Sequence, residues 1–170
     1  GNMKKHLIII RGTPGSGKST MAAKLIDHDI AKVVLEADDY FSNGGDYKFD
    51  ASKLGEAHAD CQSKVRHFLG LGLETIVSNT STTWKEMRPY LDIARAMGAH
   101  VTIITMKTQF QNIHGVPDEK VEIMRNRMID RETFMTLHKD VYGYDFPGDY
   151  IEHEKEQKWL TVQERLSKTS

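Results

Sequence analysis

Four short apolar runs recur along the chain, and each is nearly continuous instead of alternating with polar residues. They are HLIIIR (6–11), KVVLEA (32–37), ETIVSN (74–79) and HVTIIT (100–105). Continuous runs rich in β-branched residues are typical of strands that are covered on both faces of a sheet. The pattern therefore predicts four buried, parallel strands.

Between these runs, apolar residues recur at steps of three and four, which is the spacing of one helical face. The first such face follows the first strand and comprises Met21, Ala22, Leu25 and Ile26. The second runs from Leu54 to Leu69 and the third from Met87 to Met97. Strands that alternate with helices predict an α/β fold with right-handed crossovers around a parallel sheet.

The ends of the two longer helices also have sequence signals. Asp50 is the predicted N-cap of the second helix, and Gly70 or Gly72 is predicted to end it. The third helix is predicted to close at Gly98. These signals place the helices in the order that the alternation requires.

Two segments lie outside the alternation. The segment 40–50 (YFSNGGDYKFD) has Asn-Gly-Gly turn chemistry, which predicts a surface flap. A helix is predicted to follow Pro117 in NIHGVPDEKVEIMRNRMIDR, and we interpret residues from about 110 to 131 as a lid. Further on, 149–157 (DYIEHEKEQ) is compatible with a fifth strand and 162–168 with a short terminal helix. No interdomain linker is visible, so we expect one domain over residues 1–170.

Composition narrows the classes of partner. A net charge of -1 gives no overall attraction to nucleic acid, so any polyanion site must be a local patch. The single cysteine, Cys61, cannot form an internal disulfide, which favours a reducing compartment. No apolar run approaches the roughly 20 residues that cross a bilayer. We therefore expect a cytoplasmic protein with no membrane partner; the sequence leaves its oligomeric state open.

The stretch GTPGSGKST directly after the first strand fits the phosphate-loop pattern G-x-x-x-x-G-K-[ST]. In such a loop, backbone N–H groups and the start of the next helix face the phosphates, and glycines keep side chains out of the way. Lys18 is predicted to neutralise the β- and γ-phosphates, and the Ser19 hydroxyl to ligate Mg²⁺. We expect ATP or another nucleoside triphosphate to bind Gly12, Thr13, Pro14, Gly15, Ser16, Gly17, Lys18, Ser19 and Thr20.

Asp38 and Asp39 follow the second predicted strand. Ligands of open α/β sheets bind at the carboxyl ends of the strands. A kinase that phosphorylates an alcohol gains from a carboxylate there, because the carboxylate orients the hydroxyl and takes its proton. Two aspartates and no arginine at this position favour an alcohol acceptor over a phosphate acceptor.

The motifs together resemble those of P-loop kinases of the polynucleotide 5'-kinase type, over residues 6 to about 130. The resemblance depends on GTPGSGKST, ADDYF, IVSNTSTTWKEMRPY and NIHGVPDEKVEIMRNRM, in this order and spacing. It implies a kinase-type three-layer fold with the phosphate-loop strand central and a helical lid. It also implies transfer of the γ-phosphate to a nucleic-acid hydroxyl, with Asp38 at the position of the family's general base.

Three positions depart from the family pattern. Phe41 stands where the family has an arginine, and Asn79 stands where the third strand of the family ends in an aspartate. The lid offers Gln109, Gln111, Asn112 and His114 where the family supplies an arginine, with Arg125 and Arg127 only further along. We expect Arg125 or Arg127 to reach the transferring phosphate, and Asn79, Thr80 and Asp39 to help bind the acceptor. Because the altered positions lie on the acceptor side, a nucleoside or small-molecule alcohol remains an alternative acceptor.

Other nucleotide-dependent classes fit less well. A regulatory GTPase needs a guanine-reading Asn-Lys-x-Asp motif, which the chain does not contain. A nucleoside monophosphate kinase needs arginines around the acceptor phosphate, and residues 36–60 have none. The acidic pair in VVLEADD loosely matches a motor ATPase. A P-loop ATPase and a nucleotide-binding module without kinase activity therefore stay open beside the kinase.

Overall fold

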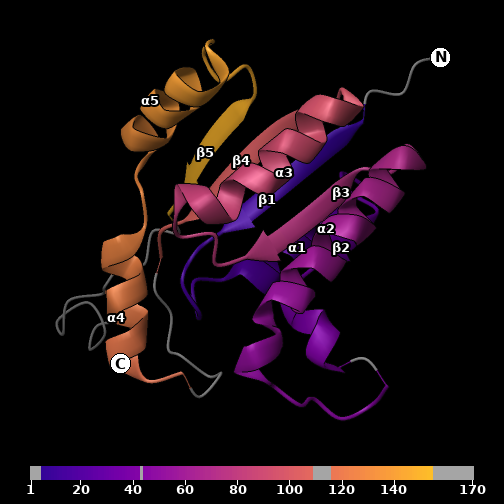
Figure 1. The fold of residues 1–170 in the computed structure, drawn as a ribbon, viewed down its shortest axis with the longest axis vertical. Coiled ribbons are helices and arrows are strands. Elements are labelled where there is room, and N and C mark those ends of the chain that lie inside the picture. Colours follow the sequence, from indigo (N-terminus) through magenta and orange to yellow (C-terminus); the bar gives the residue numbers. More distant parts are fainter. Residues whose placement is uncertain (1–4, 43, 109–115, 155–170) are drawn as a thin grey trace, which may run out of the picture.

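The computed structural model describes residues 5–42, 44–108 and 116–154. Five parallel strands form one sheet in the order β2-β3-β1-β4-β5. These strands are β1 (His6–Arg11), β2 (Val33–Leu35), β3 (Thr75–Asn79), β4 (His100–Met106) and β5 (Asp149–His153). The predicted α/β class, the five-stranded parallel sheet and the central position of the phosphate-loop strand are confirmed (Figure 1).

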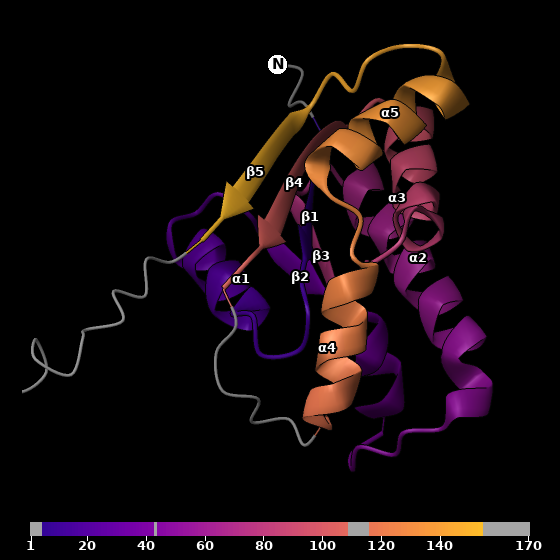
Figure 2. The same cartoon turned by 90° about the vertical axis from the view of Figure 1, so that its left-hand side faces the viewer.

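Helices cover both faces of the sheet, as the near-continuous apolar strands require (Figure 2). Alternate β1 residues contribute to two separate clusters: Leu7 and Ile9 join the cluster under α2 (Leu54–Gly70) and α3 (Trp84–Met97). Ile8 and Ile10 join the cluster under α1 (Lys18–Asp27). The molecule therefore has three layers. Within the described residues, no helix is long and apolar enough to cross a membrane.

The short helices differ in detail from the predictions. Asp50 caps a 3₁₀ helix, η2 (Ala51–Lys53), which leads directly into α2, so it is not the cap of α2 itself. The predicted flap begins later than residue 40. Tyr40 and Phe41 instead belong to the other 3₁₀ helix, η1 (Ala37–Ser42), which comes earlier in the chain. Phe41 is only 7% exposed and is part of the core, which explains why this end of the segment is fixed.

The predicted lid contains α4 (Asp118–Arg127), which begins directly after Pro117 as expected. It ends at Arg127, and Arg131 instead begins a separate helix, α5 (Arg131–Tyr142), that the sequence analysis did not predict. Figures 1 and 2 both show α4 beyond the arrowheads of the strands, on the side of the sheet where β1 ends. Residues 109–115 and the predicted terminal helix over 162–168 lie outside the described residues.

Candidate active site

The phosphate loop connects β1 to α1 and is held to the neighbouring strand. The Gly12 N–H donates a hydrogen bond to the Thr80 carbonyl just beyond β3, at 3.2 Å. Within the loop, Ser16 N–H bonds Thr13 O at 3.1 Å, and Gly15 and Gly17 have φ angles of 82° and 92°. Such angles favour glycine strongly, so the sequence pattern and the backbone agree here.

Gly12 has a packing reason as well. A Cβ atom at this position would overlap Ser16 Oγ within the loop, and it would lie 3.0 Å from Met106 Cβ and 3.2 Å from the Met106 carbonyl oxygen. Because that oxygen belongs to the backbone of β4, it has little freedom to move. Glycine at position 12 therefore lets the loop turn directly against the neighbouring strand.

Lys18 folds back over this loop. Its Nζ donates to the carbonyl oxygens of Gly12 and Thr13 at 2.9 and 3.1 Å. Burial lowers the pKa of Lys18 to about 8, although the nearby Glu36 carboxylate opposes that shift. The ammonium group is therefore only weakly compensated, and a phosphate group would supply the missing negative charge.

The remaining loop hydroxyls also suit a polar ligand. Ser16 Oγ is buried and has no hydrogen-bond partner among the described residues, and the same is true of Ser78 Oγ on β3. A buried hydroxyl of this kind is rare unless a ligand or water completes it. Ser19 and Thr20, by contrast, are exposed at the start of α1. An exposed hydroxyl next to bound phosphates fits the oxygen ligands that Mg²⁺ prefers.

Asp38 and Asp39 lie in η1, which follows β2, and β3 separates β2 from the strand that leads into the loop. The two side chains have different partners. Asp39 Oδ2 accepts from the Glu36 N–H at 3.2 Å and so closes its own turn. Asp38 Oδ1 accepts from the Tyr47 hydroxyl at 2.8 Å and is exposed. Asp38 is thus already in contact with an alcohol-like group.

Asn79 connects the phosphate-loop side of the site with η1, which carries Asp38 and Asp39. Its Oδ1 accepts from the Ala37 N–H at 2.9 Å, and its Nδ2 donates to the Tyr90 hydroxyl at 3.3 Å. The next residue, Thr80, accepts from the phosphate loop. A continuous path therefore runs from Gly12 through β3 to the residue before Asp38. The predicted acceptor-binding roles of Asn79, Thr80 and Asp39 stay predictions.

The sequence analysis missed a third carboxylate, that of Glu36. Its pKa is raised by burial and then by the negative charges of Asp39 and Asp38, while Lys18 acts in the opposite direction. Glu36 therefore interacts electrostatically with both the loop lysine and the two aspartates. A signal for it exists in the sequence, since Glu36 follows the last residue of β2 and lies two positions before Asp38.

Arg125 and Arg127 are both exposed on α4. Figures 1 and 2 show α4 beyond the arrowheads of the strands, so the helix lies at the same end of the sheet as the phosphate loop. The Arg125 carbonyl accepts from the Met128 N–H, but neither guanidinium group forms a hydrogen bond or ion pair with another described residue. Their predicted contact with a transferring phosphate stays a prediction.

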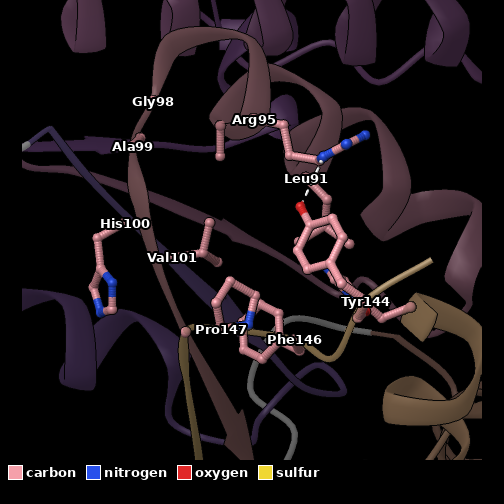
Figure 3. A pocket seen from close by; sticks show the side chains of 12 residues that line it. Leu91, Arg95, Gly98, Ala99, His100, Val101, Tyr144, Phe146 and Pro147 are labelled. Carbon is pink, nitrogen blue, oxygen red and sulfur yellow. Dashed lines mark hydrogen bonds between the residues drawn. The ribbon is translucent and has the colours of Figure 1, made fainter. Parts of the chain in front are cut away.

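A separate pocket of about 540 Å³ opens far from this site, between α3, the start of β4 and the segment before β5 (Figure 3). Arg95 and Tyr144 both line it and are in contact, with Arg95 Nε donating to the Tyr144 hydroxyl at 2.9 Å. His100 and Val101, which begin β4, line the same pocket. Because the phosphate loop is at the other end of the strands, this pocket is not part of the candidate site.

Comparisons with known proteins give evidence on the family and the fold of the chain. The model of the family described as "AAA domain" matches residues 7–138. Human NEDD4-binding protein 2 is 34% identical over 128 residues, which cover 69% of this chain but only 7% of that protein. The chain thus corresponds to a small part of this relative.

Solved structures give the fold. A gluconokinase from Sinorhizobium meliloti 1021 has a TM-score of 0.58 at 13% identity, covering 96% of this chain and 90% of its own. A chain of a Pnkp1/Rnl/Hen1 complex has a TM-score of 0.56 at 20% identity, covering 95% and 50%. The fold is therefore that of P-loop kinases, and these likenesses leave the acceptor unspecified.

Replacing Gly12 by alanine tests the loop. We expect Gly12→Ala to weaken binding of an ATP analogue by more than about tenfold, because the new methyl group must displace the loop from β4. Gly55→Ala is the matched control, since a Cβ at Gly55 would meet nothing within 4 Å. Isothermal titration calorimetry measures both. Equal affinities for the two variants would contradict the role assigned to Gly12.

The lowered pKa of Lys18 gives a pH prediction. With a pKa of about 8, the free protein loses the Lys18 proton as the pH rises from 7 to 9. We expect the affinity for an ATP analogue in metal-free buffer to fall roughly tenfold over that interval, following the protonated fraction. Lys18→Ala should bind more weakly with a flat profile. A flat profile for the unmodified chain would show that this ammonium group does not hold the nucleotide.

Proposed function

The chain belongs to the AAA domain family, and we propose that it is a phosphotransferase that moves the γ-phosphate of ATP, or of another nucleoside triphosphate, to a hydroxyl group. The proposed acceptor is the 5'-OH or another hydroxyl of a polynucleotide. The observation that carries the proposal is the hydrogen bond from the Tyr47 hydroxyl to Asp38, at 2.8 Å. The residue before Asp38 is linked to the phosphate loop through Asn79 and Thr80, which supports a role for this carboxylate in receiving a hydroxyl proton.

In the proposed reaction, the acceptor oxygen forms a bond to the γ-phosphorus. The bond from that phosphorus to the β–γ bridging oxygen breaks, ADP leaves, and the acceptor's proton passes to Asp38. The loop N–H groups and Lys18 stabilise the charge on the phosphates. The Ser19 hydroxyl would hold Mg²⁺, which supplies charge neutralisation when it is bound with the nucleotide.

The lid is proposed to complete the site. Arg125 or Arg127 would approach the transferring phosphate when α4 moves toward the phosphate loop. The exposure of both guanidinium groups and the place of α4 beyond the strand ends support this role. A planar guanidinium group can donate two hydrogen bonds to phosphate oxygens at once.

The choice of a polynucleotide acceptor is supported by the motif resemblance between residues 6 and 130. The alternative acceptor is a nucleoside or small-molecule alcohol, because Phe41 and Asn79 replace family residues on the acceptor side. A P-loop ATPase or a nucleotide-binding module without kinase activity is the second alternative. The cytoplasmic location stays a prediction.

A transfer assay with γ-labelled ATP and a panel of acceptors tests the proposal. The panel contains a single-stranded oligonucleotide with a free 5'-OH, a nucleoside and gluconate. Label on the oligonucleotide supports the proposal, whereas label on another alcohol alone supports the alternative acceptor. Free phosphate without transfer would indicate an ATPase, and no turnover would indicate a binding module.

Asp38→Asn tests the mechanism. We expect kcat to fall by roughly 10²–10⁴-fold, because the amide cannot accept the proton, while nucleotide affinity stays within about twofold. Asp46→Asn is the control, since it removes the same charge from an exposed aspartate of the same segment. Near-normal turnover of Asp38→Asn would remove Asp38 from the mechanism.

A further inference from the structure

Two aromatic side chains stand exposed beside the candidate base. Tyr47 and Phe49 are 53% and 55% exposed, which is unusual for large apolar rings so close together in sequence. Both rings meet the buried ring of Phe41 edge to face, at centroid distances of 6.3 and 5.2 Å. We call Tyr47 and Phe49 the aromatic shelf. Because both rings pack against the buried Phe41, their orientations are restricted before a ligand binds. A ligand that contacts the shelf therefore loses little free energy in ordering them.

The shelf is attached to Asp38 through the Tyr47 hydroxyl. That hydroxyl donates to Asp38 Oδ1 at 2.8 Å and so occupies the position in which an acceptor hydroxyl would meet the carboxylate. Partial burial and the bond to Asp38 raise the pKa of Tyr47, so the phenol is neutral at physiological pH and remains a donor. An acceptor hydroxyl can therefore replace the phenol at Asp38 without any change of charge.

The charges around the shelf argue against recognition of phosphates there. Residues 44–53 contain Asp46, Lys48, Asp50 and Lys53, whose formal charges cancel, and the adjoining Asp38 adds a negative charge. A segment without net charge has little attraction for a nucleic-acid backbone. Exposed aromatic rings, however, bind unstacked bases with little dependence on sequence. The chemistry of the shelf thus favours a flat, uncharged ring system.

We propose that Tyr47 and Phe49 are specificity-determining residues that stack on the nucleobase adjoining the acceptor hydroxyl, with the Tyr47 phenol holding the place of that hydroxyl until it arrives. This inference rests on the proposed function, since it assigns the shelf to the acceptor of that reaction. The shelf selects acceptors that carry a base, and Asp38 then receives their hydroxyl. Small alcohols without a ring lack the stacking contact.

Equilibrium binding tests the shelf without turnover. Fluorescence anisotropy in metal-free buffer would compare a 3'-labelled single-stranded oligonucleotide with one whose 5'-terminal residue is abasic. We expect the unmodified chain to bind the intact oligonucleotide at least about tenfold more tightly, in line with base–aromatic stacking. A nucleoside 3'-phosphate, added as competitor, distinguishes a free nucleotide from a polynucleotide end as the natural ligand. If it binds as tightly as the oligonucleotide, the free nucleotide is indicated; if it binds more weakly, the polynucleotide end is indicated. Either outcome supports base stacking on the shelf.

Variants assign the effect to the two rings. Tyr47→Leu and Phe49→Leu should each weaken intact oligonucleotide binding by about 5- to 100-fold and lose discrimination against the abasic form. Tyr47→Phe keeps the aromatic ring and should therefore keep both the affinity for the intact oligonucleotide and the discrimination against the abasic form. Tyr144→Leu, at a tyrosine that is 39% exposed and lies near the opposite end of the strands, is the control and should bind normally.

Three results would overturn the proposal: equal binding of intact and abasic oligonucleotides, unchanged binding by both leucine variants, or an equal loss in Tyr144→Leu. Failure of the unmodified chain to bind both the oligonucleotide and the nucleoside 3'-phosphate would be a fourth such result. The transfer assay is independent of these results. If the chain binds bases at the shelf but transfers no phosphate, the proposed role of the shelf is supported and the proposed kinase function is contradicted.

Discussion

The site depends on one buried cation, the guanidinium group of Arg11 at the end of β1. Arg11 is fully buried and donates to the carbonyl oxygens of Ser81, Thr82 and Ile129. It also donates to the hydroxyls of Thr105 on β4 and Tyr150 on β5. Burial lowers the pKa of Arg11, but arginine starts so high that the group keeps its charge. A single side chain therefore ties together the strand ends, and the phosphate loop begins at the very next residue.

The same group fixes one end of the lid. The Ile129 carbonyl accepts from Arg11, and the Ile129 N–H donates to Thr82 O at 3.0 Å, so the chain just after α4 is held twice against the sheet. The helix itself buries only Val121. Few buried contacts and a fixed end are what a helix needs if it is to move as a unit. Arg125 and Arg127 thus lie on a helix that is anchored at one end and packs only weakly against the rest of the molecule.

The sequence predicted what depends on local pattern and missed what depends on distant partners. The strands and the loop were predictable because a doubly covered strand must be apolar throughout and because the loop needs glycine at fixed positions. Helix α5 was missed because one of its two buried residues is His138, a polar residue on the apolar face. Phe41 was assigned to a flap because the Asn-Gly-Gly turn follows it. Arg11 could not be predicted, because its acceptors are loop carbonyls about 70 and 118 residues away in sequence.

The acceptor side shows why a departure from a motif needs the structure before it can be interpreted. As an amide, Asn79 accepts from the Ala37 N–H and donates to the Tyr90 hydroxyl at the same time. An ionised carboxylate has no proton to donate, so an aspartate there would require Tyr90 to reverse its role. Tyr90 is buried, and burial raises its pKa, so it remains a neutral hydroxyl that suits the amide. The amide therefore braces η1 against β3, and in the proposed reaction it is Asp38, one residue after the Ala37 N–H that Asn79 holds, that contacts the acceptor hydroxyl.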